Sequence, residues 1–245
     1  MPYSDILTKK TWYENLNFEK NPFSMKPNHT FDLRGQEKVS EKVIKLIKKE
    51  GMCVVHGTYG TGKTSFLHKI ITTFKGHKKV VYFSCNRLTQ ELDFKKLLTE
   101  RTLISKLFNI KGKQMILLLD EADSLSKTDF TKIATNYKKG FVKSVIFITH
   151  NLKQFELPRD VAKIVDKNIF TFERLDEETV IQIVHDRVGN NPLLPNDVVK
   201  EIYTKSRSMR HFLKNCEIFM RHMVEKKRKK ASKKDVNTIL KKYAV

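Results

Sequence analysis

The sequence predicts an α/β protein with two parts, a three-layer αβα domain built on a parallel sheet and a small all-α domain after it. Two observations predict this. Up to about residue 174, short apolar segments rich in β-branched residues alternate with segments of helical spacing, the pattern of strands joined by helices. After residue 175 only helical spacing remains. We therefore assign residues 1–174 to an N-terminal arm and the αβα domain, and residues 175–245 to a helical domain with a basic C-terminal segment.

The arm comes first in the chain and is rich in aromatic side chains. Trp12, Tyr13, Phe18 and Phe23 lie in it, and the dipeptide Asn21-Pro22 interrupts them. Proline breaks helices and strands, so we expect an extended segment whose rings pack on a neighbouring domain.

The elements of the αβα domain follow in order, marked by apolar residues at helical or strand spacing. The expected helices cover residues 40–49, 65–74, 94–108 and 126–138, and the expected strands cover residues 52–56, 79–84, 115–119, 143–149 and 164–172. The strand 115–119, Met-Ile-Leu-Leu-Leu, is apolar throughout, which is typical of a central parallel strand covered on both faces.

The helical domain carries four apolar stripes at three- and four-residue steps. We expect helices over residues 176–188 and 209–223, a helix capped by Asn196, and a last helix after Ser232. Ser232 and Asp235 have the spacing of a capping box, which satisfies the free N–H groups at a helix start.

A phosphate-binding loop lies between the first strand and the helix after it. The run from Gly57 to Thr64 reads G-x-x-x-x-G-K-[ST], the P-loop pattern, in the strand-then-helix context that this motif requires. Glycines let successive N–H groups turn inward toward phosphates, and the helix start adds its positive dipole end. Lys63 would add a point charge, and the Thr64 hydroxyl would bind Mg²⁺. This predicts a P-loop NTPase that binds a nucleotide and Mg²⁺ through Gly57, Thr58, Tyr59, Gly60, Thr61, Gly62, Lys63, Thr64 and Ser65.

Two acidic residues, Asp120 and Glu121, end the apolar strand 115–119. We expect this strand to lie beside the strand that leads into the loop, so that Asp120 holds the magnesium ion through water. Glu121 would then orient and polarise the attacking water, and the site would hydrolyse the bound nucleotide. The alternative is that the two acids only cap the next helix.

Charge and composition restrict the partners and the compartment. The formal net charge is +21, and residues 221–245 hold ten Lys or Arg against two acids. Such a field attracts polyanions, so nucleic acid or an anionic membrane surface is indicated. The longest apolar run, Met115–Leu119, is far too short to span a membrane. Three widely spaced cysteines suggest neither a disulfide framework nor a zinc site, and we expect a reduced, cytoplasmic protein.

From about Arg34 to Leu240 the chain resembles AAA+ ATPases, specifically the initiator branch that contains the archaeal and eukaryotic origin-recognition proteins and DnaA. The runs Gly60-Thr61-Gly62-Lys63-Thr64 and Leu119-Asp120-Glu121-Ala122-Asp123-Ser124-Leu125 carry the resemblance. The segment 31–36 matches the part of the family next to adenine. The arm, with Asn21-Pro22-Phe23, is also similar to that of transposition-regulator ATPases.

The resemblance implies three further site residues. Ile146-Phe147-Ile148-Thr149-His150-Asn151 aligns with the strand that ends in the sensor 1 residue, usually Asn, which places His150 there with Asn151 and Thr149 as alternatives. Arg159 lies in the segment that carries the arginine finger, which reaches the ATP of an adjacent subunit; an ordinary surface arginine is the alternative. Arg210 matches the sensor 2 arginine of the helical lid, although Arg207 stands where the family has Gly and Tyr59 where it has Pro or a small residue.

The family's DNA-reading winged-helix domain has no counterpart before Val245, so we expect contacts to DNA phosphates with little sequence preference. The implied function is an ATP-dependent switch that binds duplex DNA and forms a homo-oligomer when ATP is bound. It would act in replication initiation and helicase loading or in transposition, with a helicase, replication or transposase partner. The alternatives are an AAA+ ATPase that acts on a protein, as clamp loaders and signalling ATPases do, and a protein that holds ATP as a structural ligand.

Overall fold

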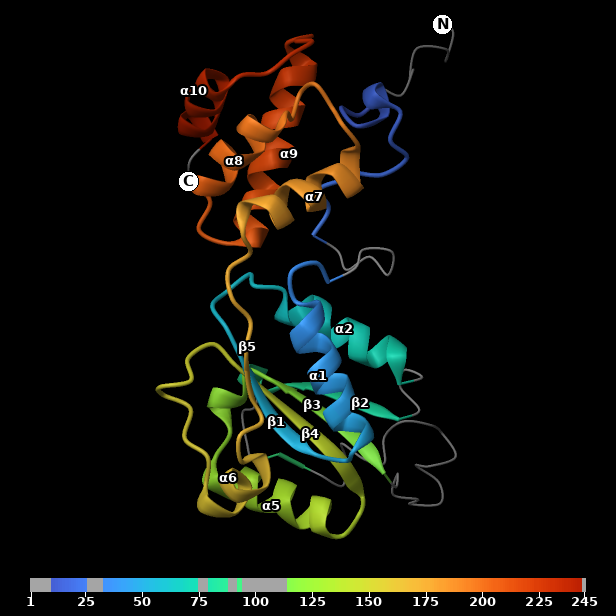
Figure 1. Ribbon diagram of the computed structural model, residues 1–245, viewed down its shortest axis with the longest axis vertical. Coiled ribbons are helices and arrows are strands. Elements are labelled where there is room, and N and C mark those ends of the chain that lie inside the picture. The colour runs from blue at the N-terminus through green and yellow to red at the C-terminus, as the bar shows by residue number, and fades with distance from the viewer. Residues whose placement is uncertain (1–9, 26–32, 75–78, 88–91, 94–113, 244–245) are drawn as a thin grey trace, which may run out of the picture. The chain divides into compact units, whose positions relative to one another are not determined.

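The computed structural model describes residues 10–25, 33–74, 79–87, 92–93 and 114–243, which form two compact units (Figure 1). One unit is Gly35–Arg174, and the other joins Leu175–Val245 to Met1–Arg34. The helix expected over residues 94–108 and most of the segment 31–36 lie outside the described residues. In the part of the chain that is described, no helix is long and apolar enough to cross a membrane.

The first unit is built on a five-stranded sheet in the order β2-β3-β4-β1-β5, with every pair of neighbours parallel. The strands are β1 (Met52–His56), β2 (Val80–Ser84), β3 (Met115–Asp120), β4 (Val142–Thr149) and β5 (Ile169–Thr171). The predicted α/β class with a parallel sheet is confirmed. Parallel strands end at the same edge, so the residues that follow β1, β3 and β4 are brought together there.

Two details of the expected sheet are wrong. β3 does not lie beside β1, because β4 pairs with both and separates them. β4 is the strand most deeply buried along its length, which fits a central place in the sheet. The strand expected over 164–172 is only Ile169–Thr171, because α6 continues through Val165.

Helices cover both faces of this sheet. They are α1 (Glu37–Lys48), α2 (Lys63–Thr73), α5 (Lys127–Lys138) and α6 (Arg159–Val165). Alternate strand residues such as Val54 and Phe147 share a core with Phe130 of α5 and Val161 of α6. Their buried neighbours in sequence face the other side, where α1 contacts β1 and β4. Figure 1 shows the resulting three layers, with α1 and α2 on one side and α5 and α6 on the other.

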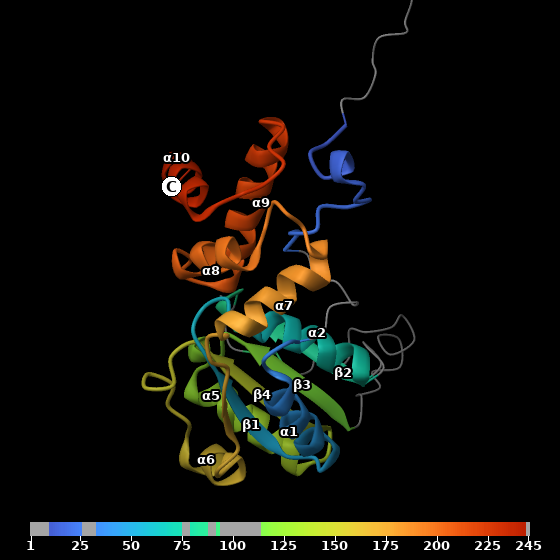
Figure 2. The ribbon, with the colours of Figure 1, turned by 45° about the horizontal axis from the view of Figure 1, so that its top comes forward.

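The second unit is a bundle of α7 (Glu177–Val188), α8 (Asn196–Thr204), α9 (Met209–Glu225) and α10 (Lys233–Tyr243) (Figure 2). Asp176 caps α7 by accepting a hydrogen bond from the Thr179 N–H. The expected cap at Asn196 is wrong. Pro195 precedes α8, and the Asn196 side chain instead accepts a hydrogen bond from His185 Nε2 at 2.9 Å. Asp235 accepts from the Ser232 N–H at 2.9 Å, as one half of a capping box requires.

The N-terminal arm packs on this bundle. Trp12 and Phe23 are buried in the same core as the apolar faces of α7, α8 and α9. The half-buried Arg187 of α7 donates a hydrogen bond to the Pro22 carbonyl at 2.7 Å. The sequence-based division put the arm with the αβα domain, whereas its described residues, 10–25, belong with the helices, because these rings fill the core of the bundle.

Candidate functional site

The loop between β1 and α2 has the backbone of a phosphate cradle. Gly60 and Gly62 have φ angles of 78° and 97°, a region that side chains disfavour. A Cβ atom on Gly57 would lie 2.4 Å from the Phe172 carbonyl oxygen, so only glycine fits there. Gly62 immediately precedes α2, and the free N–H groups of the first helical turn therefore face the loop.

Lys63 is folded back into this loop and is 5% exposed. Its ammonium group donates hydrogen bonds to the carbonyl oxygens of Gly57 and Thr58, the latter at 2.8 Å. Burial lowers the pKa of Lys63 to about 8, although Asp120 and Asp123 partly oppose the shift. A buried cation among backbone groups fits a phosphate ligand, because phosphate oxygens would supply the negative charge that burial demands. Thr64 and Ser65 are exposed at the start of α2.

Asp120 and Glu121 lie at the end of β3, where both are partly buried. Asp120 accepts hydrogen bonds from the Glu121 N–H at 3.1 Å and from the Tyr82 hydroxyl at 3.3 Å. Glu121 adopts a left-handed backbone with φ of 54°, and its side chain makes no capping hydrogen bond to the short 3-10 helix that follows. α5 has its own capping box, formed by Ser126 and Asp129. Neither Asp120 nor Glu121 therefore serves as a helix cap through its side chain.

β2 contributes two side chains that the sequence did not single out. Ser84 is aligned with Asp120 on the neighbouring strand, and its hydroxyl lies 3.3 Å from Glu121 Oε2 and 2.8 Å from Asn86 Oδ1. Tyr82, two residues earlier on the same face of β2, reaches Asp120. The sequence offered one signal for them: Tyr82 and Ser84 are polar residues at alternate positions near the end of a predicted strand. Without knowledge of which strand borders β3, that signal could not be connected to the acids.

The three residues at the end of β4 have different environments. The Thr149 hydroxyl is buried, donates a hydrogen bond to Asp123 and accepts one from the Asn151 N–H at 3.1 Å. The exposed Asn151 side chain accepts from the Lys153 N–H at 3.1 Å, which closes a local turn. His150 instead stacks on Tyr59 of the loop, with ring centroids 3.8 Å apart and planes at 23°. Of the three sensor 1 candidates, His150 is the one whose side chain contacts the phosphate loop.

His150 is held as a neutral ring. Burial and the nearby Lys63 charge lower its pKa, against the opposing effect of Asp120, Glu121 and Asp123. Its Nδ1 atom is buried and has no hydrogen-bond partner among the described residues. This nitrogen is an orphaned polar atom beside the phosphate loop, as expected of a site built for a polar ligand.

The two predicted arginines lie outside this cluster of contacts. Arg159 is the first residue of α6 and is exposed, and Arg210 is exposed in the first turn of α9, in the helical unit. Neither makes an ion pair or side-chain hydrogen bond with another residue in the ranges that the structure describes. Both side chains are available to a ligand or a second subunit.

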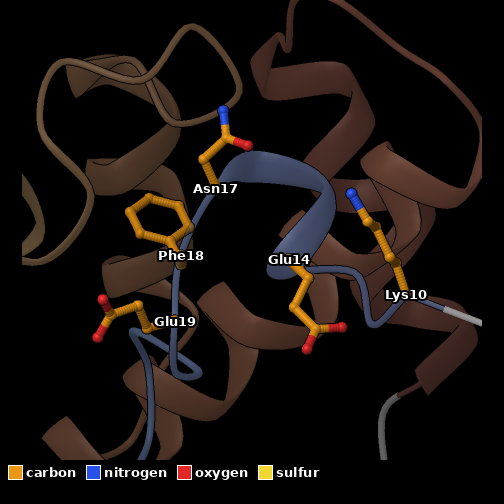
Figure 3. A pocket seen from close by; sticks show the side chains of 5 residues that line it. All are labelled: Lys10, Glu14, Asn17, Phe18 and Glu19. Carbon is orange, nitrogen blue, oxygen red and sulfur yellow. The ribbon is translucent and has the colours of Figure 1, made fainter. Parts of the chain in front are cut away.

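A separate hollow of about 520 Å³ lies along the arm. Lys10, Glu14, Asn17, Phe18 and Glu19 line it. Figure 3 shows their side chains pointing in different directions, and they combine one cation with two acids. Because no set of like groups converges on one point, the cluster at the strand ends remains the better candidate site.

Comparisons with known proteins agree with this geometry. Residues 53–172 match the family described as "ATPase family associated with various cellular activities (AAA)". Among solved structures, the chain is similar to Drosophila ORC bound to DNA (TM-score 0.69, 18% identity, 100% of this chain and 68% of that one). It is also similar to Cdc6p from Pyrobaculum aerophilum (0.69, 18%, 92% and 71%) and to the Thermotoga maritima RuvB Holliday junction branch migration motor (0.63, 14%, 85% and 69%). No curated protein sequence matches the chain.

Proposed function

We propose that this protein is an ATP-dependent switch that binds duplex DNA. Two findings support this: residues 53–172 match the AAA ATPase family, and the fold of the chain is similar to those of ORC and Cdc6 proteins. The observation that carries the ATPase half is the cluster at the strand ends. A glycine cradle, a buried lysine and two acids meet at one edge of the sheet. A cationic segment of the helical unit supports the DNA half.

Each residue of the cluster has a place in ATP hydrolysis. The N–H groups of the loop and Lys63 would bind the β- and γ-phosphates, and Thr64 and Asp120 would hold Mg²⁺, which neutralises charge on the phosphate oxygens. Glu121 would orient and deprotonate the attacking water. The Ser84 hydroxyl, 3.3 Å from Glu121, would have to release that carboxylate before it can reach the water.

His150, Arg159 and Arg210 would report the state of the nucleotide. His150 would contact the γ-phosphate from within the same unit. Arg159 would reach the ATP of an adjacent copy of the chain, which makes the ATP-bound form a homo-oligomer. Arg210 would couple the helical unit to the nucleotide. The exposure of both arginines supports these roles, because an arginine already paired within its unit would have to give up that partner first.

The DNA-binding half rests on seven cations that follow α9. Lys226, Lys227, Arg228, Lys229, Lys230, Lys233 and Lys234, hereafter the α9–α10 cationic surface, are all exposed, and no acid lies among them. Arg228 forms an ion pair with Asp235 at 3.5 Å, and none of the six lysines forms one with another described residue. Uncompensated cations on one short segment repel one another, and phosphates would relieve that repulsion.

The interaction of cations with helix dipoles explains the positions of only some of these lysines. Lys226 and Lys227 follow the C-terminus of α9, where cations are favourable. Lys233 and Lys234 occupy the first turn of α10, where a cation opposes the helix dipole. The backbone between the helices is ordered, since the Arg228 N–H bonds back to the Met223 carbonyl at 2.9 Å and Asp235 binds Ser232. The lysines are therefore presented on a defined turn.

The process that we propose is replication initiation or helicase loading, with transposition as the other DNA process that the motifs fit. The similar structures include ORC bound to DNA and an Aeropyrum pernix Orc1 protein in complex with DNA. The RuvB motor has a related fold, and so the fold alone does not select one process.

Binding of duplex DNA at low salt tests the proposal. Fluorescence anisotropy with a labelled duplex should show binding in the presence of ATP and Mg²⁺, similar for unrelated sequences. The logarithm of the affinity should fall linearly with the logarithm of the salt concentration, because phosphate contacts release counterions. Sedimentation velocity should show a larger species with ATP than with ADP. A protein that binds no DNA at low salt, but whose ATP turnover responds to a protein partner, would favour the clamp-loader-like alternative.

A further inference from the structure

Tyr59 is a large aromatic residue in the phosphate loop that is not part of the hydrophobic core. Its side chain is 71% exposed, yet one face of the ring lies against His150. We propose that Tyr59 is a positioning residue that clamps the His150 imidazole beside the phosphate loop, so that His150 meets the γ-phosphate end of the nucleotide. This inference rests on the proposed ATPase function.

The stack is close enough to fix the plane of the imidazole. The centroid distance of 3.8 Å is shorter than the separation of most aromatic pairs, and the planes differ by only 23°. Near-parallel rings in contact permit sliding but resist tilting. The edge of the imidazole, which carries both nitrogens, is thereby held in one plane.

Hydrogen bonds to the described residues do not fix this ring. The residue before it is anchored, since the Thr149 hydroxyl is bonded to Asp123, and Asn151 after it begins a separate turn. His150 itself has no hydrogen bond among the described residues, and its Nδ1 is buried without a partner. A side chain with a fixed backbone but no polar anchor depends on the stack for its orientation.

The charges around His150 are consistent with a clamp on a neutral ring. Lys63, Asp120, Glu121 and Asp123 are the charged groups that act on it. Burial and Lys63 lower the pKa of His150, so the ring is neutral near pH 7 and can donate one hydrogen bond. Because Tyr59 belongs to the loop and His150 to the end of β4, the stack links the two segments that would contact the same phosphate.

Two substitutions separate the ring from the hydroxyl of Tyr59. Tyr59→Ala removes the stack, and Tyr59→Phe keeps it. We expect Tyr59→Ala to lower kcat about 10- to 100-fold, the range for a misplaced catalytic group. The affinity for a fluorescent nucleotide should fall much less than kcat, because the loop binds phosphates through backbone N–H groups and not through this side chain. Tyr59→Phe keeps the ring that stacks on His150, so it should recover most of the kcat that Tyr59→Ala loses. Met25→Ala, which truncates another exposed large side chain, serves as the control for nonspecific effects.

NMR of histidine-labelled protein measures the positioning directly and does not depend on turnover. Tyr59→Ala should shift the ring signals of His150, assigned by His150→Asn, and leave the signals of the other seven histidines in place. The pKa of His150 should also move toward its ordinary value, because removal of Tyr59 exposes the ring.

Three results would overturn the inference while leaving the ATPase function intact. They are unmoved His150 signals in Tyr59→Ala, unchanged kcat in Tyr59→Ala, and an equal loss of kcat when Tyr59→Ala is added to an active His150→Asn protein. The last result would mean that Tyr59 acts independently of His150. A wild-type protein that binds and hydrolyses no ATP would instead contradict the proposed function, and this inference with it.

Discussion

The αβα unit and the helical unit present their functional residues in opposite ways. In the αβα unit the candidates at the strand ends have specific neighbours: Lys63 binds loop carbonyls, Ser84 touches Glu121, and His150 stacks on Tyr59. In the helical unit the α9–α10 cationic surface is exposed, and its lysines form no ion pair with described residues. A site defined by contacts should lose its activity when one residue is changed. A surface defined by charge should lose DNA affinity gradually, as cations are removed one by one. This contrast can be tested from both sides.

The largest expected effect is that of one carboxylate in the αβα unit. Glu121→Gln keeps the size of the side chain but removes its basicity, so ATP turnover should fall about 100-fold or more while ATP binding persists. Turnover and fluorescent-nucleotide binding, measured on the same preparation, check this. Asp160→Asn, which neutralises an exposed acid on α6, is the matched control and should leave turnover unchanged. Turnover that survives Glu121→Gln would remove the catalytic assignment and favour ATP as a structural ligand.

The arm gives the next largest effect, on the stability of the helical unit. Phe23 is 1% exposed within the bundle core, and truncation to Ala should cost about 3–5 kcal/mol of unfolding free energy. Chemical denaturation followed by nucleotide binding and by helical circular dichroism would separate the two units. Met25→Ala, with the side chain 53% exposed, should cost less than about 0.5 kcal/mol. If Phe23→Ala destabilised the αβα unit instead, the placement of the arm would be wrong.

Graded loss is expected of the cationic surface. Each lysine removed should reduce the salt slope of DNA binding by about 0.9, provided that it contacts one phosphate. A single Lys233→Ala should therefore weaken binding only a few-fold, and the combined change should weaken it about 10- to 100-fold at moderate salt. The combined variant carries Ala at Lys229, Lys230, Lys233 and Lys234, and its control carries Ala at the α1 lysines Lys38, Lys42, Lys45 and Lys48. Equal losses in the two variants would mean that net charge, not this surface, binds DNA.

The smallest effect is a dependence of nucleotide affinity on pH. Lys63 must be protonated to bind phosphates, and its pKa without nucleotide is about 8. Below pH 8 the proton is already present; above it, binding must take up a proton, so affinity falls as pH rises. Between pH 7 and pH 9 the dissociation constant should increase about tenfold. Lys63→Arg, whose guanidinium stays charged, should show no such dependence even if it binds more weakly. A flat profile for wild type would contradict the buried position of Lys63.

The sequence was sufficient for the residues that belong to one continuous motif. The loop motif, the strand ending in Asp120 and the change to helices near residue 175 all depend on local spacing. In the structure β3 ends at Asp120, and the described elements from α7 onward are all helices. The sequence was not sufficient for contacts between strands. The order of the sheet placed β4 between β1 and β3, and this order decides that Ser84 lies against Glu121.

The same limit applies to the arm and to the end of β4. Aromatic residues in an extended segment indicate that the segment packs on a hydrophobic core, but the sequence does not identify that core. In the structure Phe23 is buried in the core of the helical unit. The sequence placed His150 at the sensor 1 position but left Asn151 and Thr149 as alternatives. The three differ in the structure because only His150 has Tyr59 beside it, across 91 residues of chain.

The most direct test of the account is steady-state ATP turnover with and without duplex DNA, for wild type and for Lys63→Ala. We predict Mg²⁺-dependent turnover by wild type that rises when duplex DNA is added, and none by Lys63→Ala under either condition. Turnover that ignores DNA would contradict the proposed DNA-linked switch. Turnover that survives Lys63→Ala would contradict the nucleotide site itself.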